Sequence, residues 1–185
     1  PESDLDILDL ADSLYQQQKL RRVYYSGYVP ISDDNRLPVL QSPPVQRENR
    51  LYQADWLMRF YGFKRQEIVD QQYPNLDMEL DPKLAYALRH PSLFPIDVNT
   101  APKEILLRIP GVGVKGVNRI IKSRRFGSLR REHLKKMGIV WKRAKYFLKT
   151  ADRDYLELNW QPEKLRQRIL WDQKPKAANQ LSLFA

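Results

Sequence analysis

A proline–glycine turn near the middle of the chain has the residue types needed to hold an anion. Gly111 and Gly113 flank Val112 directly after Ile109-Pro110, and apolar patterns predict a helix on each side of the turn. Glycines lack a Cβ, so the backbone can turn sharply and approach a ligand closely. The unpaired amides and the dipole of the second helix favour a phosphate at its N-terminus. We expect Val112 to insert into the core below and Lys115 to add charge at the same phosphate.

Two other phosphate-binding turns fit this segment less well. A dinucleotide-binding turn follows a strand, whereas the pattern of Ile105–Arg108 is helical. A P-loop requires Gly-Lys-Ser/Thr after four intervening residues, and these are absent. The remaining alternative is an ordinary helix–turn–helix corner that binds nothing.

The charge around the turn is strongly asymmetric. The chain has a net charge of +10, and residues 103–149 contain 15 Lys/Arg but 2 Asp/Glu, whereas residues 1–102 contain 11 and 15. Such a focused positive field predicts a polyanionic partner, although a solvated basic face and an RNA partner remain alternatives. Phosphate contacts carry no base code, so we expect binding to DNA that is independent of sequence and falls steeply with salt. The predicted DNA contacts are Gly111, Val112, Gly113, Lys115, Arg119, Lys122, Arg124 and Arg125.

Candidate catalytic and metal-ligating residues are few. Asp77, Glu79 and Asp81 could bind Mg²⁺ as in a nuclease, but their spacing beside a proline also fits a turn and a helix cap. His90 and His133 lie near no second ligand, and the chain has no cysteine, which excludes disulfides, zinc thiolates and cysteine-ligated iron–sulfur clusters within these residues. We therefore expect no catalytic residue and no metal site in this chain, although the pattern leaves open whether it belongs to an enzyme.

Hydrophobic periodicity predicts a mainly α chain. The expected helices span residues 4–19, 46–63 with Gly62 at the end, 65–71, 81–89 and 162–170, and four short helices lie within residues 97–149. Of these four, the first is expected to be capped by Asn99 or Thr100, the third by Ser128, and the fourth to span 141–148. A buried strand is expected at 23–29 and a short strand at 155–158, with a linker at 30–44 and a flexible tail at 174–185.

Residues 97–149 resemble the helix-hairpin-helix family, in particular the paired form of competence DNA receptors and repair proteins. The resemblance is carried by Val98–Ala101, by Ile109–Gly113, by the link Phe126–Leu129 and by a second, degenerate hairpin at Leu134–Ile139. It implies that the first hairpin holds phosphates through its amides. Val140 stands where a second glycine is common, so the second hairpin is expected to be mainly structural.

A wider resemblance extends from about residue 5 to 149. The chain is similar to the C-terminal part of the putative DNA modification/repair radical SAM proteins that are linked to uracil-DNA glycosylase. The matching segments are Arg22–Ser26, Arg50–Phe63, Asn75–Asp77, Asp81–Ala85 and Phe94–Asn99.

This resemblance implies four regions and a larger parent. Residues 1–30 would end an incomplete radical SAM α/β barrel, 31–96 would form a linker and helical platform, 97–150 the tandem helix-hairpin-helix domain, and 151–185 a C-terminal extension. The parent would use a 4Fe-4S cluster and S-adenosylmethionine, held by cysteines upstream of this chain, and a uracil-DNA-glycosylase-like protein is an implied partner. The chain starts with Pro1 and not with methionine, which also favours a part of a larger protein.

The C-terminal end resembles the peptide that binds the bacterial sliding clamp. Such a peptide is extended and buries large apolar side chains in a pocket. The alternative is that the same side chains dock on this protein's own surface. The residues that carry the resemblance are Gln180, Leu181, Ser182, Leu183 and Phe184.

The remaining expectations concern location and rival functions. No apolar run approaches the roughly 20 residues that span a bilayer and no signal peptide is evident, so a cytoplasmic location without membrane contact is expected. The leading hypothesis is the DNA-binding end of a radical SAM repair protein. The alternatives are a standalone, non-enzymatic DNA-binding adaptor recruited to the clamp, and an RNA- or ribosome-binding protein.

Overall fold

A computed structural model gives the fold, and it describes residues 2–27, 44–152 and 161–173. This part of the chain is mainly helical, as the sequence predicts, with one pair of short strands. The predicted linker at 30–44, apart from its last residue, lies outside the described residues, as do the strand at 155–158 and the tail that contains 180–184. Among the described helices, none is long and apolar enough to cross a membrane.

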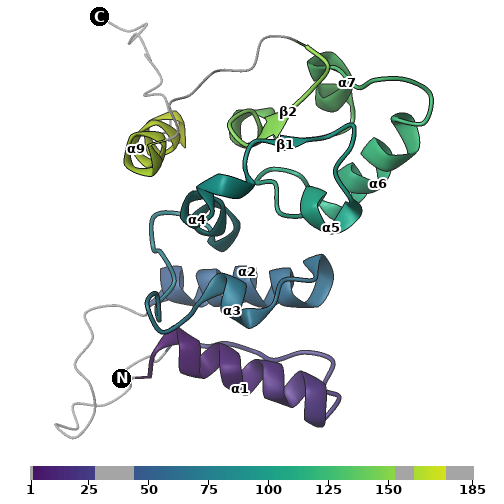
Figure 1. The fold of residues 1–185 in the computed structure, drawn as a ribbon. Coiled ribbons are helices and arrows are strands. Elements are labelled where there is room, and N and C mark those ends of the chain that lie inside the picture. The colour runs from purple at the N-terminus through teal and green to yellow at the C-terminus, as the bar shows by residue number, and fades with distance from the viewer. Residues whose placement is uncertain (1, 28–43, 153–160, 174–185) are drawn as a thin grey trace, which may run out of the picture.

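Four helices form a stacked layer under the basic region (Figure 1). They are α1 (Asp4–Gln17), α2 (Val45–Tyr61), α3 (Arg65–Ile68) and α4 (Pro82–Arg89). Their ends follow local signals: Gly62 ends α2 in the left-handed conformation with φ 65°, and the Asp81 carboxylate accepts a hydrogen bond from the Leu84 amide at the start of α4. We call this layer the platform.

The basic region folds as two consecutive helical hairpins. The first hairpin (residues 103–123) joins α5 (Lys103–Leu106) to α6 (Val114–Ser123), and the second hairpin (residues 131–144) joins α7 (Arg131–Lys136) to α8 (Trp141–Ala144). A 3-10 turn, η1 (Pro91–Leu93), leads from the platform into this region, and α9 (Pro162–Gln173) lies beside α4 (Figure 1). One continuous apolar core runs through the platform, both hairpins and α9.

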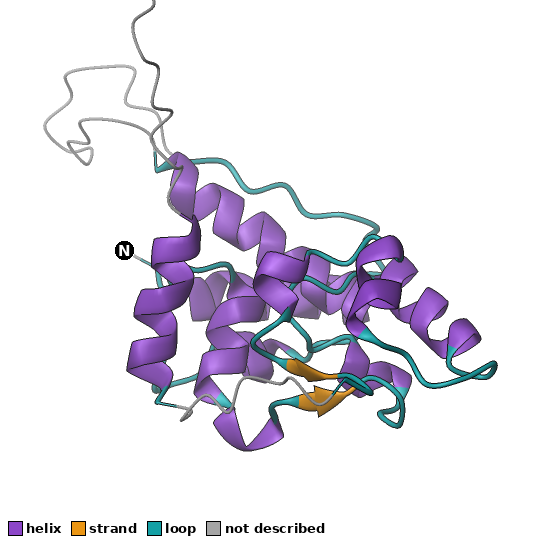
Figure 2. Cartoon of the chain, turned by 90° about the horizontal axis from the view of Figure 1, so that it is seen from above, coloured by secondary structure: helices purple, strands orange, loops and turns teal. Residues whose placement is uncertain are grey.

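Two short parallel strands close the hairpin region. β1 (Ile96–Asp97) pairs with β2 (Leu148–Lys149), and Figure 2 shows them side by side. The Ile96 amide donates to the Phe147 carbonyl at 3.0 Å, so the ends of the region are tied together. The predicted helix over 141–148 is therefore wrong beyond Ala144, because the backbone that follows is used for this pairing.

The expected helix caps in this region are also wrong. α5 begins after Pro102, and the Asn99 side chain instead accepts a hydrogen bond from the Leu129 amide at 2.7 Å. α7 begins after Arg130 and not after Ser128. At Asn99, a contact distant in sequence therefore replaces the expected local cap.

The described part of the expected strand at 23–29 forms no strand. Val23–Gly27 has no regular secondary structure, and its backbone bonds to side chains of helices. The Val23 amide donates to the Tyr15 hydroxyl, and the Gly27 amide donates to the Glu48 carboxylate. Aromatic and β-branched residues favour a segment that packs on a half-buried surface. Here that surface is formed by helices and not by a neighbouring strand. The expected helix at 65–71 is likewise short, because α3 ends at Ile68.

Candidate nucleic-acid interface

Gly111 gives the first hairpin its shape. It lies in the left-handed region with φ 79°, and a Cβ at this position would stand 2.7 Å from the Val140 carbonyl oxygen. The Gly111 carbonyl in turn accepts a hydrogen bond from the Val140 amide at 3.0 Å. The turn therefore requires glycine both for its backbone conformation and for its close approach to the second hairpin.

Gly113 has a different role, because the fold does not require a glycine there. Its φ of −93° is ordinary, and the atom nearest to a Cβ added at this position would be the Tyr61 hydroxyl oxygen, at 3.5 Å. Gly113 is the N-cap of α6, and among the described residues no group accepts a hydrogen bond from the amides of Gly113, Val114 and Lys115. Unpaired amides at the start of a ten-residue helix favour an anion.

A buried lysine holds the turn between these two glycines. The Val112 side chain is 1% exposed, as expected for a residue that inserts into the core. Its carbonyl oxygen accepts a hydrogen bond from Lys83 Nζ at 2.6 Å, and that ammonium lies 4.7 Å from the centre of the Tyr61 ring. Burial lowers the pKa of Lys83 to about 7, and the nearby Asp81 carboxylate opposes that shift. Sequence reasoning misses Lys83, because an isolated lysine in a helix is ordinarily exposed.

The predicted cationic contacts fall into two groups. Lys115, Lys122 and Arg125 are exposed on α6 and just after it. Arg119 is also exposed, but its guanidinium donates to the Met137 carbonyl of the second hairpin at 2.7 Å. Arg124 donates to the carbonyls that precede α5, so it supports the fold as well as adding charge.

The second hairpin repeats the backbone plan of the first. Gly138 has φ 77°, and α8 begins three residues later, as α6 begins three residues after Gly111. Ile139 is buried like Val112, but Val140 stands in place of Gly113 and its amide is already bonded. This geometry agrees with an internal repeat in which one turn is open and the other is occupied.

No family model, curated protein or solved structure matches the chain. The interpretation of the site therefore depends on its own geometry. Gly111, Gly113 and Gly116 have the spacing of a dinucleotide-binding turn, but the helix α5 precedes them where that turn needs a strand.

The acidic cluster considered for a nuclease is engaged in structural contacts. The Asp77 carboxylate accepts hydrogen bonds from the amides of Glu79 and Leu80 and pairs with Arg166. Asp81 caps α4 and pairs with Arg143 at 3.1 Å. In the part of the chain that the structure describes, no three His, Cys, Asp or Glu side chains are grouped to hold a metal ion.

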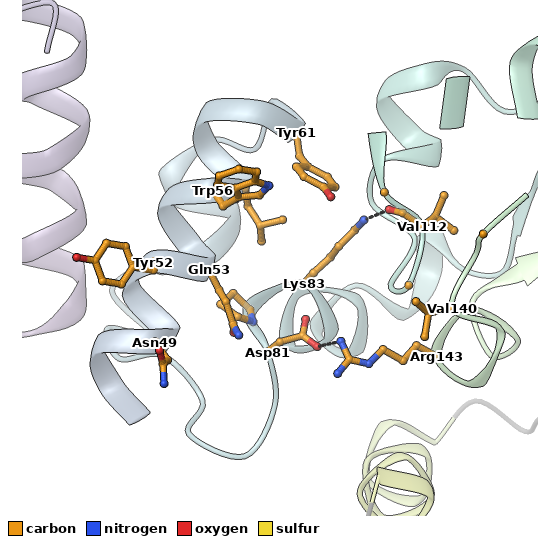
Figure 3. A pocket seen from close by; sticks show the side chains of 15 residues that line it. Asn49, Tyr52, Gln53, Trp56, Tyr61, Asp81, Lys83, Val112, Val140 and Arg143 are labelled. Carbon is orange, nitrogen blue, oxygen red and sulfur yellow. Dashed lines mark hydrogen bonds and ion pairs between the residues drawn. The ribbon is translucent and has the colours of Figure 1, made fainter. Parts of the chain in front are cut away.

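A groove lies between the platform and the two hairpin turns (Figure 3). Its volume is about 650 Å³, and sequence reasoning does not anticipate it. α2 supplies one wall and the hairpin glycines the other, with Lys83 reaching across to Val112. The feature of the sequence that could have indicated the groove is the pair of aromatic residues Trp56 and Phe60, which lie exposed among polar residues on the solvent-facing side of α2.

Proposed function

We propose that the chain binds the phosphate backbone of duplex DNA without reading its sequence, and that the first hairpin is the contact. The observation that carries this proposal is the open N-terminus of α6 at Gly113, set in a segment with 15 cationic and 2 acidic residues. Helix amides and exposed cations together provide the backbone contacts that position a protein on DNA. Residues 97–150 would then be a tandem helix-hairpin-helix domain, as the resemblance implies, with a second hairpin that is mainly structural.

The supporting cations differ in what they can add. Lys115 lies in the first turn of α6, beside the open amides, and Lys122 and Arg125 extend the positive surface along that helix. Each phosphate neutralised by such a cation releases counterions, so affinity should fall steeply with salt. Arg119 and Arg124 would contribute charge from positions fixed by their hydrogen bonds to the backbone.

The test is fluorescence anisotropy with a labelled random-sequence duplex across a salt series. Gly113→Asp places a carboxylate at the open amides. We expect at least a tenfold loss of affinity for the duplex and an unchanged free energy of unfolding. Val140→Asp is the matched control, since it makes the same change in charge at the corresponding position of the second hairpin, and it should lose far less. Equal losses, or no binding by the wild type, would refute the proposal, and competition by structured RNA that exceeds competition by duplex DNA would favour the RNA-binding alternative.

We also propose, from the wider resemblance alone, that this chain is the C-terminal part of a radical SAM DNA repair or modification protein. Such a protein holds its 4Fe-4S cluster through cysteines, and this chain contains none, so the residues present do not fit the cluster. The cluster, S-adenosylmethionine and any contact with a uracil-DNA-glycosylase-like protein would belong to the parent. A reading frame that continues upstream and encodes three closely spaced cysteines would support this proposal, and an upstream stop codon would refute it.

Recruitment to a sliding clamp is a separate proposal that rests on residues 180–184 of the sequence. Deletion of residues 180–185 should abolish binding to the purified clamp and leave DNA affinity unchanged. Retention of clamp binding by the truncated chain would exclude this peptide as the contact.

A further inference from the structure

The groove between the platform and the hairpin turns has two chemically different walls. The wall formed by α2 presents uncharged side chains, and those along the groove that project toward solvent are Asn49, Gln53 and Trp56. The opposite wall is made of the backbone of the two hairpin turns, with Arg143 at its edge. Its volume of about 650 Å³ is in the range of small-ligand sites, which is about 300–1,000 Å³.

The α2 wall suits a planar, uncharged group. Trp56 is 56% exposed and packs against Phe60 with ring centres 4.3 Å apart. The Arg59 guanidinium lies over the Phe60 ring, 4.9 Å from its centre, so Trp56 is the ring of this pair that lines the groove and is open to a ligand. Bases stack favourably on such rings whatever their identity. Gln53 lies one turn before Trp56 on α2, and its amide can both donate to and accept from the edge of a base.

The hairpin wall suits a phosphate. Gly113 lines the groove, and its amide is the first of the three open amides at the start of α6. Tyr61 also lines the groove, and its hydroxyl oxygen is the atom nearest to the place of a Cβ at Gly113, at 3.5 Å. Lys83 fixes the neighbouring Val112 carbonyl from the floor of the groove. A ligand with a planar base at one end and a phosphate at the other matches both walls, and an apolar peptide would leave the hairpin wall without a partner.

We propose that the groove takes one unpaired nucleotide of the bound DNA strand, with its base on Trp56 and its phosphate at Gly113. A base inside an intact duplex is stacked on both faces and cannot reach this wall unless it leaves the helix. The inference rests on the proposed function, because the hairpin must already hold the backbone of that strand. It adds a preference for DNA that contains an unpaired nucleotide.

The test compares two labelled duplexes that differ by one bulged nucleotide, using the full chain and anisotropy at one salt concentration. The wild type should bind the bulged duplex about tenfold more tightly, as expected for one base stacked on an aromatic ring. Trp56→Ala should abolish this preference and leave affinity for the intact duplex unchanged, whereas Trp56→Phe should retain most of it. Trp171→Ala removes another exposed tryptophan, on α9 and outside the groove, and should behave as the wild type.

A second readout reports on the groove directly. With 2-aminopurine as the bulged base, the wild type and Trp171→Ala should quench its fluorescence, and Trp56→Ala should not. If the wild type binds both duplexes equally, or if Trp56→Ala keeps the preference, the groove proposal is overturned while the hairpin remains the DNA contact. If the intact duplex binds but Gly113→Asp does not weaken it, the proposed function itself fails.

Discussion

The two hairpins share a backbone plan and differ in what their neighbours do to it. Each has a glycine with positive φ, a buried residue after it, and a helix that begins three residues beyond the glycine. In the second hairpin the Val140 amide is bonded to Gly111, and the helix that follows has four residues. In the first, the amides at Gly113 are open and lead into ten residues of cationic helix.

The difference shows how one turn can be specialised by support from the other. The Val140 amide of the second hairpin donates a hydrogen bond to the Gly111 carbonyl, and Lys83 of the platform donates one to the Val112 carbonyl. The backbone of the first turn is therefore held from both sides. Because these amides are already held in place, binding an anion does not cost the conformational entropy of ordering the turn. If this comparison is correct, substitutions at corresponding positions of the two hairpins should have unequal effects.

The largest expected effect is on stability, at the glycines that define the two turns. Gly111→Ala and Gly138→Ala both place an alanine at positive φ, but the new Cβ at position 111 would stand 2.7 Å from a backbone oxygen. At position 138 the nearest atom is the end of the flexible Arg119 side chain, at 3.2 Å. We expect urea unfolding to show a loss of about 3 kcal/mol for Gly111→Ala and about 1 kcal/mol for Gly138→Ala. Equal losses would mean that the two turns are supported alike.

The next effect is a pH dependence of stability that comes from Lys83, which supports the first hairpin but not the second. Because the pKa of Lys83 is lowered to about 7 by burial, the unfolded chain binds more protons than the folded chain between pH 7 and the ordinary lysine pKa of 10.5. Burying the charged ammonium of Lys83 destabilises the folded chain fully below pH 7, and this destabilisation decreases as the pH rises. The free energy of unfolding should therefore increase by about 2 kcal/mol from pH 7 to pH 9. Lys83→Met should remove this slope. A variant with the wild-type slope would assign the pH dependence to other groups.

Local signals explain which parts of these hairpins can be predicted from sequence. The sequence predicts the helix that follows the glycine turn, which is α6, and the Asp81 cap at the start of α4, because turn glycines, prolines and capping residues act within a few positions. Asn99 has the side chain of a helix cap but bonds to Leu129, thirty positions away, and no local pattern reports such a contact. The groove escapes prediction for the same reason, since Trp56 and Gly113 come together only through packing of the platform on the hairpins.

A smaller effect separates charge that supports the hairpins from charge that is free to contact DNA. Arg119→Gln removes the guanidinium that bonds to Met137 of the second hairpin, and it should lower the free energy of unfolding by about 1 kcal/mol. Lys122→Gln, on the same helix and exposed, should leave stability unchanged and reduce the slope of log affinity against log salt by about 1. Urea unfolding and salt titration of both variants decide the assignment. Identical profiles for the two would place Arg119 among the purely electrostatic contacts.

The smallest expected effect lies where the two hairpins touch. Gly116 is in the first turn of α6, and a Cβ there would meet side-chain carbons of Ile139 and Val112 at 3.5 and 3.6 Å, which is ordinary van der Waals contact. Gly116→Ala should therefore raise the free energy of unfolding by about 0.5–1 kcal/mol, because alanine loses less backbone entropy in a helix and adds contact between the hairpins. DNA affinity should stay unchanged, since this methyl group faces the core and not the open amides. A loss of stability would show that the hairpins pack too tightly here for even one methyl group, and that Gly116 belongs with Gly111 as a residue that the close approach requires.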